Sequence, residues 1–201
     1  MGEAAKITFR TQLGFSQLAS KDWDQMDTNE RIQFEKEVGL DKGQDYEKLS
    51  KININWLDKV YNDKAPLQNY ELSVNGGTEK LNYYVSGSYY DQDGIAVGST
   101  FERVNFRANV EAKSNKLLKR GTNTMFTYQE VEQSDDGEYA LWAPISASFF
   151  MLPYWNPYKE DGSLALQDDG SWKGTTENPL AWMENNPLSN KKYKLLSTFY
   201  A

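Results

Sequence analysis

The chain has 201 residues and a formal net charge of −7, and it contains neither cysteine nor histidine. The acidic balance argues against a nucleic-acid binder, which needs a basic surface. The lack of cysteine and histidine excludes disulfides, thiolate or imidazole metal ligands and catalytic triads built on either residue.

No stretch of the sequence has the roughly 20 apolar residues that a transmembrane helix needs. The first residues lack the apolar core of a signal peptide, which predicts either a cytosolic protein or an internal piece of a longer chain. Aromatic residues make up 14% of the chain, with 13 tyrosines and 6 tryptophans. This surplus suits a ligand-binding surface or an aromatic belt at a membrane interface.

The first predicted element is a strand, in the stretch AKITFRTQLGFSQ. Ile7, Phe9 and Leu13 share one face, while Arg10 and Gln12 share the other. This period of two residues is typical of a β-strand.

A long polar connection follows, residues 19–65, with helical signals and no predicted strand. Asp27 with Glu30 three residues later forms a capping-box pattern, and Gly39 is a plausible end of that helix. Asn55 can cap a second, short helix. The apolar side of this short helix consists of Trp56, Leu57, Val60 and Tyr61.

Strands return in LQNYELSVN, and the stretch GGTEK closes a hairpin because glycines adopt positive φ freely. The next strand runs to about Tyr90. The apolar and aromatic face of this strand contains Tyr83, Val85, Gly87 and Tyr89, and its other face is polar.

The clearest strand in the chain is TFERVNFRANVEAK. Val104 and Phe106 point one way with the alanines, while Arg103, Asn105 and Arg107 point the other way. After the turn SNKLLKRG, TNTMFTYQEVEQ is a fifth strand. Residues 134–190 form a long loop, and KKYKLLSTFYA begins a sixth strand.

Connection lengths alternate along this meander, so short turns lie at one end and large loops at the other. Outer-membrane barrels have this asymmetry. Arg10, Arg103, Arg107 and Glu111 lie in mid-strand, where a sandwich core could not hold so many charges without pairing each one. A water-filled lumen can hold them, and so can an antiparallel sheet with one solvated face, which stays an alternative.

The block SVNGGTEKLNYYVSGSYYDQDGI resembles the most recognisable barrel hairpin of the SusC/RagA family of TonB-dependent outer-membrane transporters of Bacteroidetes. The strand FERVNFRANVEAK and the upstream segment NWLDKVYNDKAPLQNY are also similar to that family. The resemblance covers nearly the whole chain and is strongest over residues 55–123.

The resemblance implies an all-β fold: about six antiparallel, up-and-down strands of a transmembrane β-barrel, with short helices in a long extracellular loop. Complete barrels of this kind have roughly 22 strands and a plugged lumen. The resemblance also implies import of glycans, oligosaccharides or peptides across the outer membrane, with a SusD-like surface lipoprotein as lid and TonB acting through the plug.

The signal sequence, TonB box and plug of the family have no counterpart here. We therefore expect residues 1–201 to be the N-terminal part of the barrel, a fragment without the plug domain. We expect contact with outer-membrane lipid and none with nucleic acid.

No residue is predicted to be catalytic, to ligate a metal or to bind a cofactor. Aspartate–glycine pairs recur, in SDDGE, EDGS, DDGS and DQDG, but none has the spacing of a calcium loop, and such pairs are usual in turns. Many carboxylates are present, yet nothing singles out two of them as a glycosidase pair.

The long loop gathers aromatic residues that we predict to bind substrate, because flat rings stack on sugars. They are Trp142, Tyr154, Trp155, Tyr158, Trp172 and Trp182. Packing of the loop itself and contact with the lipoprotein are the other interpretations of these residues. The alternative for the whole chain is a soluble carbohydrate-binding β-module, in which a second sheet would cover the apolar faces.

Overall fold

All six strands of the computed structural model belong to one antiparallel sheet, in the order in which they follow along the chain. The structure describes residues 3–20, 23–41, 43–114, 118–134 and 143–201. The strands are β1 (Glu3–Ser16), β2 (Ala65–Gly77), β3 (Leu81–Asp93), β4 (Thr100–Lys113), β5 (Lys119–Ser134) and β6 (Pro187–Tyr200). This confirms the predicted up-and-down arrangement, and the sheet is open, with β1 and β6 at its edges.

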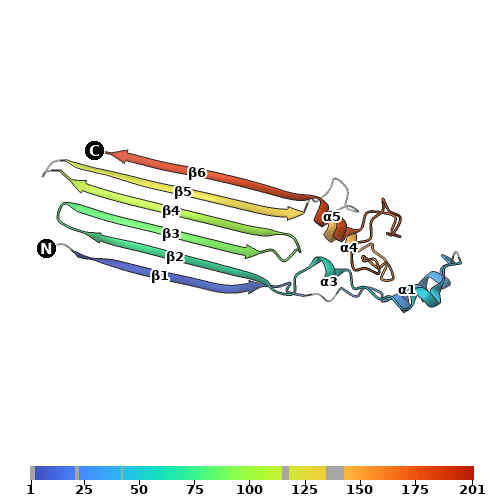
Figure 1. Ribbon diagram of the computed structural model, residues 1–201. Helices are drawn as coiled ribbons and strands as arrows, with labels where there is room; N and C mark the ends of the chain where they lie inside the picture. The colour runs from blue at the N-terminus through green and yellow to red at the C-terminus, as the bar shows by residue number, and fades with distance from the viewer. Residues whose placement is uncertain (1–2, 21–22, 42, 115–117, 135–142) are drawn as a thin grey trace.

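Five short helices lie in the described parts of the two long connections. They are α1 (Thr28–Glu37), α2 (Tyr46–Leu49), α3 (Leu57–Val60), α4 (Pro144–Ser148) and α5 (Pro179–Asn185). Within the described part of the chain none of them is long and apolar enough to cross a membrane. Figure 1 shows all the labelled helices beyond one end of the sheet, while both chain termini and the short β2–β3 turn lie at the other end.

The start of α1 has the predicted capping box. The Asp27 side chain accepts from the backbone N–H of Glu30, and the Glu30 side chain accepts from the N–H of Asp27. Two backbone donors that helix geometry leaves without partners are thereby satisfied. The helix ends as predicted near Gly39, whose φ of 73° suits glycine.

Asn55 caps α3 as the sequence indicated, because its side-chain oxygen accepts from the N–H groups of Leu57 and Asp58. The predicted apolar side of this helix is turned inward. Trp56, Leu57 and Val60 are buried.

Two strands are longer than predicted. β5 begins at Lys119 because Lys119 pairs with Lys113, so the stretch assigned to the turn extends the ladder. β6 begins at Pro187, opposite Ser134. A proline is tolerated there because it occupies the first position of an edge strand, where its missing N–H breaks no ladder bond.

The hydrophobic core lies in the loops rather than on the sheet. Trp56, Ala147, Met151, Ala165 and Trp172 form one buried cluster. On the sheet, by contrast, Phe106 is 45% exposed and Val104 is 36% exposed. The described residues contain no second sheet that covers this face, as the soluble-module alternative would require.

Candidate functional site

One face of the sheet is an apolar band that crosses all six strands. Its register is continuous: Phe9 lies opposite Leu72, and Phe106 lies opposite Phe126, which in turn pairs with Leu195. From Val104 to Ala112, at about 3.3 Å per residue, the band is roughly 26 Å long along β4. This is close to the apolar band of about 25 Å on outer-membrane barrels.

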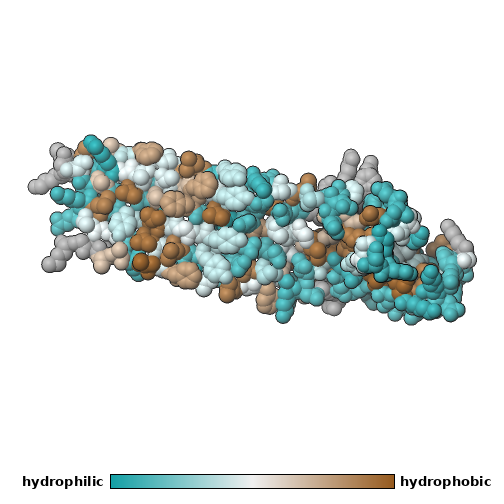
Figure 2. Space-filling model, viewed as in Figure 1, coloured by the Kyte–Doolittle hydropathy of each residue, from teal (hydrophilic) through white to brown (hydrophobic). Residues whose placement is uncertain are grey.

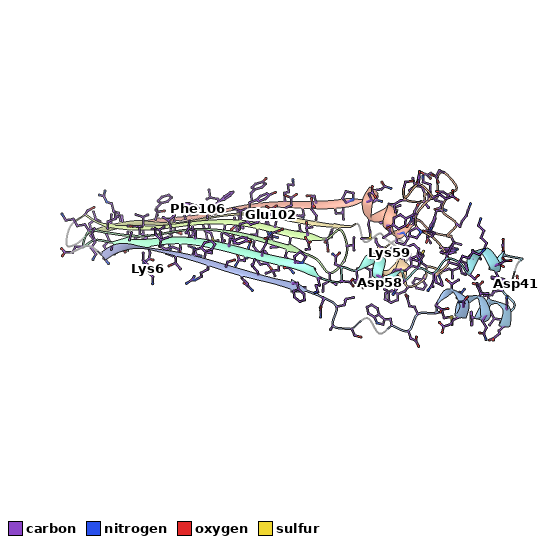
Figure 3. The ribbon with its side chains drawn as sticks, turned by 60° about the horizontal axis from the view of Figure 1, so that its bottom comes forward. Lys6, Asp41, Asp58, Lys59, Glu102 and Phe106 are labelled. Atoms are coloured by element: carbon purple, nitrogen blue, oxygen red, sulfur yellow. The ribbon has the colours of Figure 1, made fainter. Side chains whose placement is uncertain are left out.

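The band lies toward the end of the sheet that is remote from the helices. Figure 2 shows hydrophobic residues gathered on that half of the visible face, and hydrophilic residues toward the helices. In Figure 3, Phe106 and Glu102 of β4 stand on one side of the sheet and Lys6 of β1 on the other. Glu102 therefore marks the point at which this face changes from apolar to charged.

A row of tyrosines forms the boundary between these two zones. Tyr70 lies opposite Tyr89, and across β4 and β5 the same row continues through Tyr128 to Tyr193. The rings of Tyr128 and Tyr193 are 5.1 Å apart.

The tyrosine hydroxyls reach toward the loop end of the sheet. Tyr70 donates to Gln68 at 3.2 Å, and Tyr128 donates to Glu130. Gln68 and Glu130 belong to the next row, which also contains Asp91, Glu102 and Lys191. Rings on apolar surface with hydroxyls on polar groups are the arrangement of an interfacial aromatic belt.

The opposite face of the sheet is mostly polar, although Leu67, Phe101 and Val131 lie on it toward the loop end. Arg10 pairs with Glu71 at 3.4 Å, and Asn105 donates to Ser88 at 3.1 Å while accepting from Thr127 at 2.9 Å. This alternation across the pleat matches a wall with lipid on one side and water on the other.

The two long connections fold against each other at the helical end of the sheet. The Trp56 indole donates to the carbonyl of Leu152 at 3.1 Å, and the N–H of Ile54 donates to the carbonyl of Pro153 at 2.7 Å. The ring of Trp172 lies edge-on to Trp56, 5.8 Å between centroids. We call the described residues of the two long connections, which pack together in this way, the loop body.

A buried carboxylate joins the two halves of the loop body. Glu35 of α1 is 3% exposed and accepts from Arg31 at 2.8 Å and from Tyr154 at 2.7 Å. Tyr46 donates to its other oxygen at 3.4 Å. Burial, followed by the hydrogen bond to Glu35, raises the pKa of the Tyr154 phenol far above its ordinary value.

The predicted substrate-binding aromatics occupy different environments. Tyr154 and Trp172 are buried in the loop body, Trp155 and Trp182 are half-buried, and Tyr158 is 38% exposed. Trp142 lies outside the described residues. The structure brings Trp155 and Trp172 together, 5.8 Å between ring centroids, and Tyr158 lies beneath the ammonium of Lys59.

Two hollows open on the loop body. One, of about 750 Å³, is lined by Tyr158 and Lys59 together with residues of the β3–β4 connection and of α5. The other, of about 850 Å³, lies between the two connections and is lined by Trp23, Phe149 and Asp58 among others. In Figure 3, Asp58 and Lys59 mark α3, and Asp58 lines the hollow of about 850 Å³ while Lys59 lines the hollow of about 750 Å³.

Two aspartate–glycine pairs of the second connection, in EDGS and DDGS, form turns, while the pair in SDDGE lies outside the described residues. Gly162 and Gly170 have φ of 83° and 69°, and the preceding carboxylates accept from Ser163 and Ser171. These hydrogen bonds lower the pKa of Asp161 and Asp169 below the usual range.

Sequence reasoning missed Glu35, Trp23 and Phe149. Glu35 lies on a short, mostly charged helix, and nothing in its local pattern distinguishes it from the exposed Glu37. Trp23 had a usable signal, since a tryptophan in an otherwise polar segment has few local partners. Its neighbours in space, Phe149 at 5.3 Å and Tyr61 at 6.0 Å between ring centroids, come from distant segments.

The chain is similar in sequence to curated proteins that are named TonB-dependent receptors. The TonB-dependent receptors P3 and P26 of Formosa agariphila are 28% and 30% identical over 153 and 151 residues, which is 74% of this chain in each case. The TonB-dependent receptor SusC of Bacteroides thetaiotaomicron is 27% identical over 208 residues, or 95% of this chain. The chain spans only 15%, 14% and 20% of these three proteins. No family model matches it.

Two solved structures have a similar fold. One is described as the RagAB peptide transporter (TM-score 0.67, 23% identity) and the other as the RagAB peptide importer in a closed-closed state (TM-score 0.64, 26% identity). They match 82% and 81% of this chain, and the match covers 22% of each solved chain.

An open meander with one apolar face, a tyrosine row and large loops at one end is the architecture of a segment of outer-membrane barrel wall. The sequence relatives and the structural neighbours agree with that class. The predicted resemblance to the SusC/RagA family of TonB-dependent transporters is thus confirmed.

Proposed function

We propose that residues 1–201 are the N-terminal part of the barrel of an outer-membrane importer that takes up glycans, oligosaccharides or peptides. The observation that supports this function best is the apolar band, which crosses all six strands and ends at a row of tyrosines. The loops at the same end of the sheet would face the cell exterior.

The open edges of the sheet support a larger barrel. Among the described residues, β1 and β6 each pair with another strand on one side only. In lipid every backbone N–H and C=O must be paired, since each unmet group costs several kcal/mol. We propose that further strands pair with both edges.

Import by such a barrel would depend on TonB acting through a plug, and on a SusD-like surface lipoprotein over the mouth. The names of the similar proteins, TonB-dependent receptor SusC and the RagAB transporter, support both partners. The loop body is the part of this chain that such a lipoprotein would meet.

Tyr158, Trp155 and Trp182 are the accessible members of the predicted aromatic set, and we propose that they contact substrate. Tyr158 lies in the hollow of about 750 Å³ beside α5, where a ring and the Lys59 ammonium face the same space. Tyr154 and Trp172 would hold the loop body in shape from within.

Site-directed labelling tests the sidedness. These 201 residues contain no cysteine, so single cysteines can be placed in this part of the wall and spin-labelled in the complete barrel after any cysteines elsewhere in the protein have been replaced. We expect labels at Val104, Phe106 and Val110 to collide with a lipid-soluble quencher, and labels at Asn105 and Arg107 to collide with a water-soluble one. Equal lipid access on both faces, or the reverse order, would refute the proposal.

Insertion of an epitope tag tests the orientation. A tag after Gly162, in an exposed turn, should be reached by antibody on intact cells, while a tag in the β2–β3 turn at Glu79 should be reached only after permeabilisation. The opposite result would invert the topology.

A further inference from the structure

Positive charge is concentrated on the polar face of the sheet, although the whole chain is acidic. Among the side chains that the structure describes, the cations of this face are Lys6, Arg10, Arg103, Arg107, Lys113, Lys119, Lys192 and Lys194. Among the same described side chains, the carboxylates of this face are Glu71 and Glu111.

The two carboxylates are already engaged by other cations. Glu71 pairs with Arg10 at 3.4 Å, and Glu111 pairs with Lys119 at 3.7 Å. In the described part of the chain no carboxylate pairs with Arg103 and Arg107 of β4 or with Lys192 and Lys194 of β6. We call these four residues the cationic patch: Arg103, Arg107, Lys192 and Lys194.

The patch is one contiguous area. Arg103 lies opposite Gln129, which lies opposite Lys192, and Asn105 lies opposite Thr127, which lies opposite Lys194. With strands about 4.8 Å apart and about 3.3 Å per residue along them, it measures roughly 10 by 13 Å.

Arg103 is held in place by aromatic rings instead of by a counter-charge. Its guanidinium lies 5.4 Å from the ring centroid of Tyr90 and 5.8 Å from that of Phe101. Its Nε is buried and has no hydrogen-bond partner among the described residues. A guanidinium that is oriented but unpaired is prepared for an anion with two oxygens that can each accept an N–H, such as a carboxylate or a sulfate.

Neutral hydrogen-bonding groups fill the space between the charges. The Thr127 hydroxyl donates to the Asn105 oxygen at 2.9 Å, and the Asn105 amide donates to Ser88 at 3.1 Å. Among the described residues, the polar contact of the Arg107 guanidinium is one of 3.8 Å from Nη2 to the sulfur of Met125. The wall at this level can therefore bind a polar ligand that carries negative charge.

We propose that the cationic patch binds the acidic groups, carboxylate or sulfate, of the substrate that passes along this wall. The proposal rests on the proposed function, in which this face lines the lumen. Val104 belongs to the tyrosine row, and Arg103 is the next residue in β4. In the proposed orientation the patch therefore begins at the level of the extracellular boundary of the membrane. Opposite charge at the mouth of a conduit raises the local concentration of a charged ligand.

The test uses the complete transporter, purified with its partner lipoprotein, and matched pairs of probes. One pair is an oligogalacturonide and the corresponding neutral galacto-oligosaccharide. A second pair is a sulfated and an unsulfated galactan oligosaccharide, and a third is a glutamate-rich peptide and its glutamine counterpart. We expect an acidic member of at least one pair to bind more tightly than its neutral member, and more weakly as salt rises.

The variant Arg103→Gln/Arg107→Gln should lower the affinity for that acidic probe about tenfold or more, since two charge-assisted hydrogen bonds are lost. The affinity for the neutral probe should stay unchanged. Lys192→Gln and Lys191→Gln form a matched comparison. They remove the same charge from neighbouring positions of β6, but Lys191 lies on the other face, where it pairs with Glu130 at 3.1 Å. Of these two variants, only Lys192→Gln should lower the affinity for the acidic probe.

Two results would overturn the inference. One is that no acidic probe is preferred over its neutral partner. The other is that the arginine variant leaves acidic binding intact and lowers only the melting temperature, which would assign the patch to an acidic surface of the plug. Neither result affects the proposed function, because spin labels report the sidedness of the wall independently of charge preference.

Discussion

Tyr154 donates a 2.7 Å hydrogen bond to Glu35, a residue 119 positions earlier in the chain. The contact joins the connection after β5 to the connection after β1. Glu35 is buried, and its carboxylate oxygens accept hydrogen bonds from three side chains: Arg31, Tyr46 and Tyr154. Loss of any one of them leaves a buried carboxylate less satisfied.

Tyr154→Phe should loosen the loop body. Removal of a hydrogen bond to a buried charged acceptor costs about 2 kcal/mol. Hydrogen exchange of α1 and of the segment around Leu152 should become faster, while the β-strand amides stay protected. Tyr158→Phe is the control, because the ring of Tyr158 is exposed and Tyr158 is not among the donors that the structure describes around Glu35. Unchanged exchange in Tyr154→Phe would mean that the apolar cluster alone holds the loops together.

The loop body should also loosen at alkaline pH. The pKa of Tyr154 is raised in the folded state from an ordinary value of 10.0, chiefly by burial. A group with a raised folded pKa contributes stability that is complete below its unfolded pKa and is lost as the pH rises through the folded pKa. Exchange in the loops should therefore rise above about pH 10, the unfolded tyrosine value, and the rise should be smaller in Tyr154→Phe. An identical alkaline profile in both proteins would assign the effect to other groups.

A charge placed in the apolar band should impair insertion. Phe106→Arg puts a cation inside the band, one row from the tyrosine boundary, and should cost about 1–3 kcal/mol, between the values for the bilayer midplane and the interface. The matched control is Asn105→Arg, one residue away on the polar face, which should cost much less. Denaturant titration of the complete barrel refolded into vesicles measures both. Equal destabilisation by the two variants would contradict the assignment of the faces.

The isolated 201-residue chain should not stay monomeric in plain buffer. The edges of β1 and β6 each leave backbone groups unpaired, and such edges template aggregation. The apolar band adds an exposed hydrophobic surface larger than soluble monomers usually show. Analytical sedimentation should show aggregates that detergent disperses. A compact monomer that unfolds cooperatively would favour the soluble-module alternative.

The features of this protein that could be predicted from sequence are local ones. Alternation of apolar and polar residues predicted the strands and the faces on which Phe106 and Arg107 lie. The Asp27 and Glu30 pair predicted the start of α1, and Asn55 predicted α3. Each of these signals acts over a few residues, through the pleat of a strand or the free N–H groups of a helix end, so neighbouring letters are sufficient.

Only the tertiary structure decided what required distant segments to meet. The boundary of β6 at Pro187 depends on pairing with β5, and the burial of Glu35 depends on Tyr154. The alignment of tyrosines into one row and of cations into one patch depends on the register between strands, since a slip of one residue moves every side chain to the other face. Spacing within a segment cannot encode these contacts, because they arise from packing between parts of the chain that are far apart in sequence.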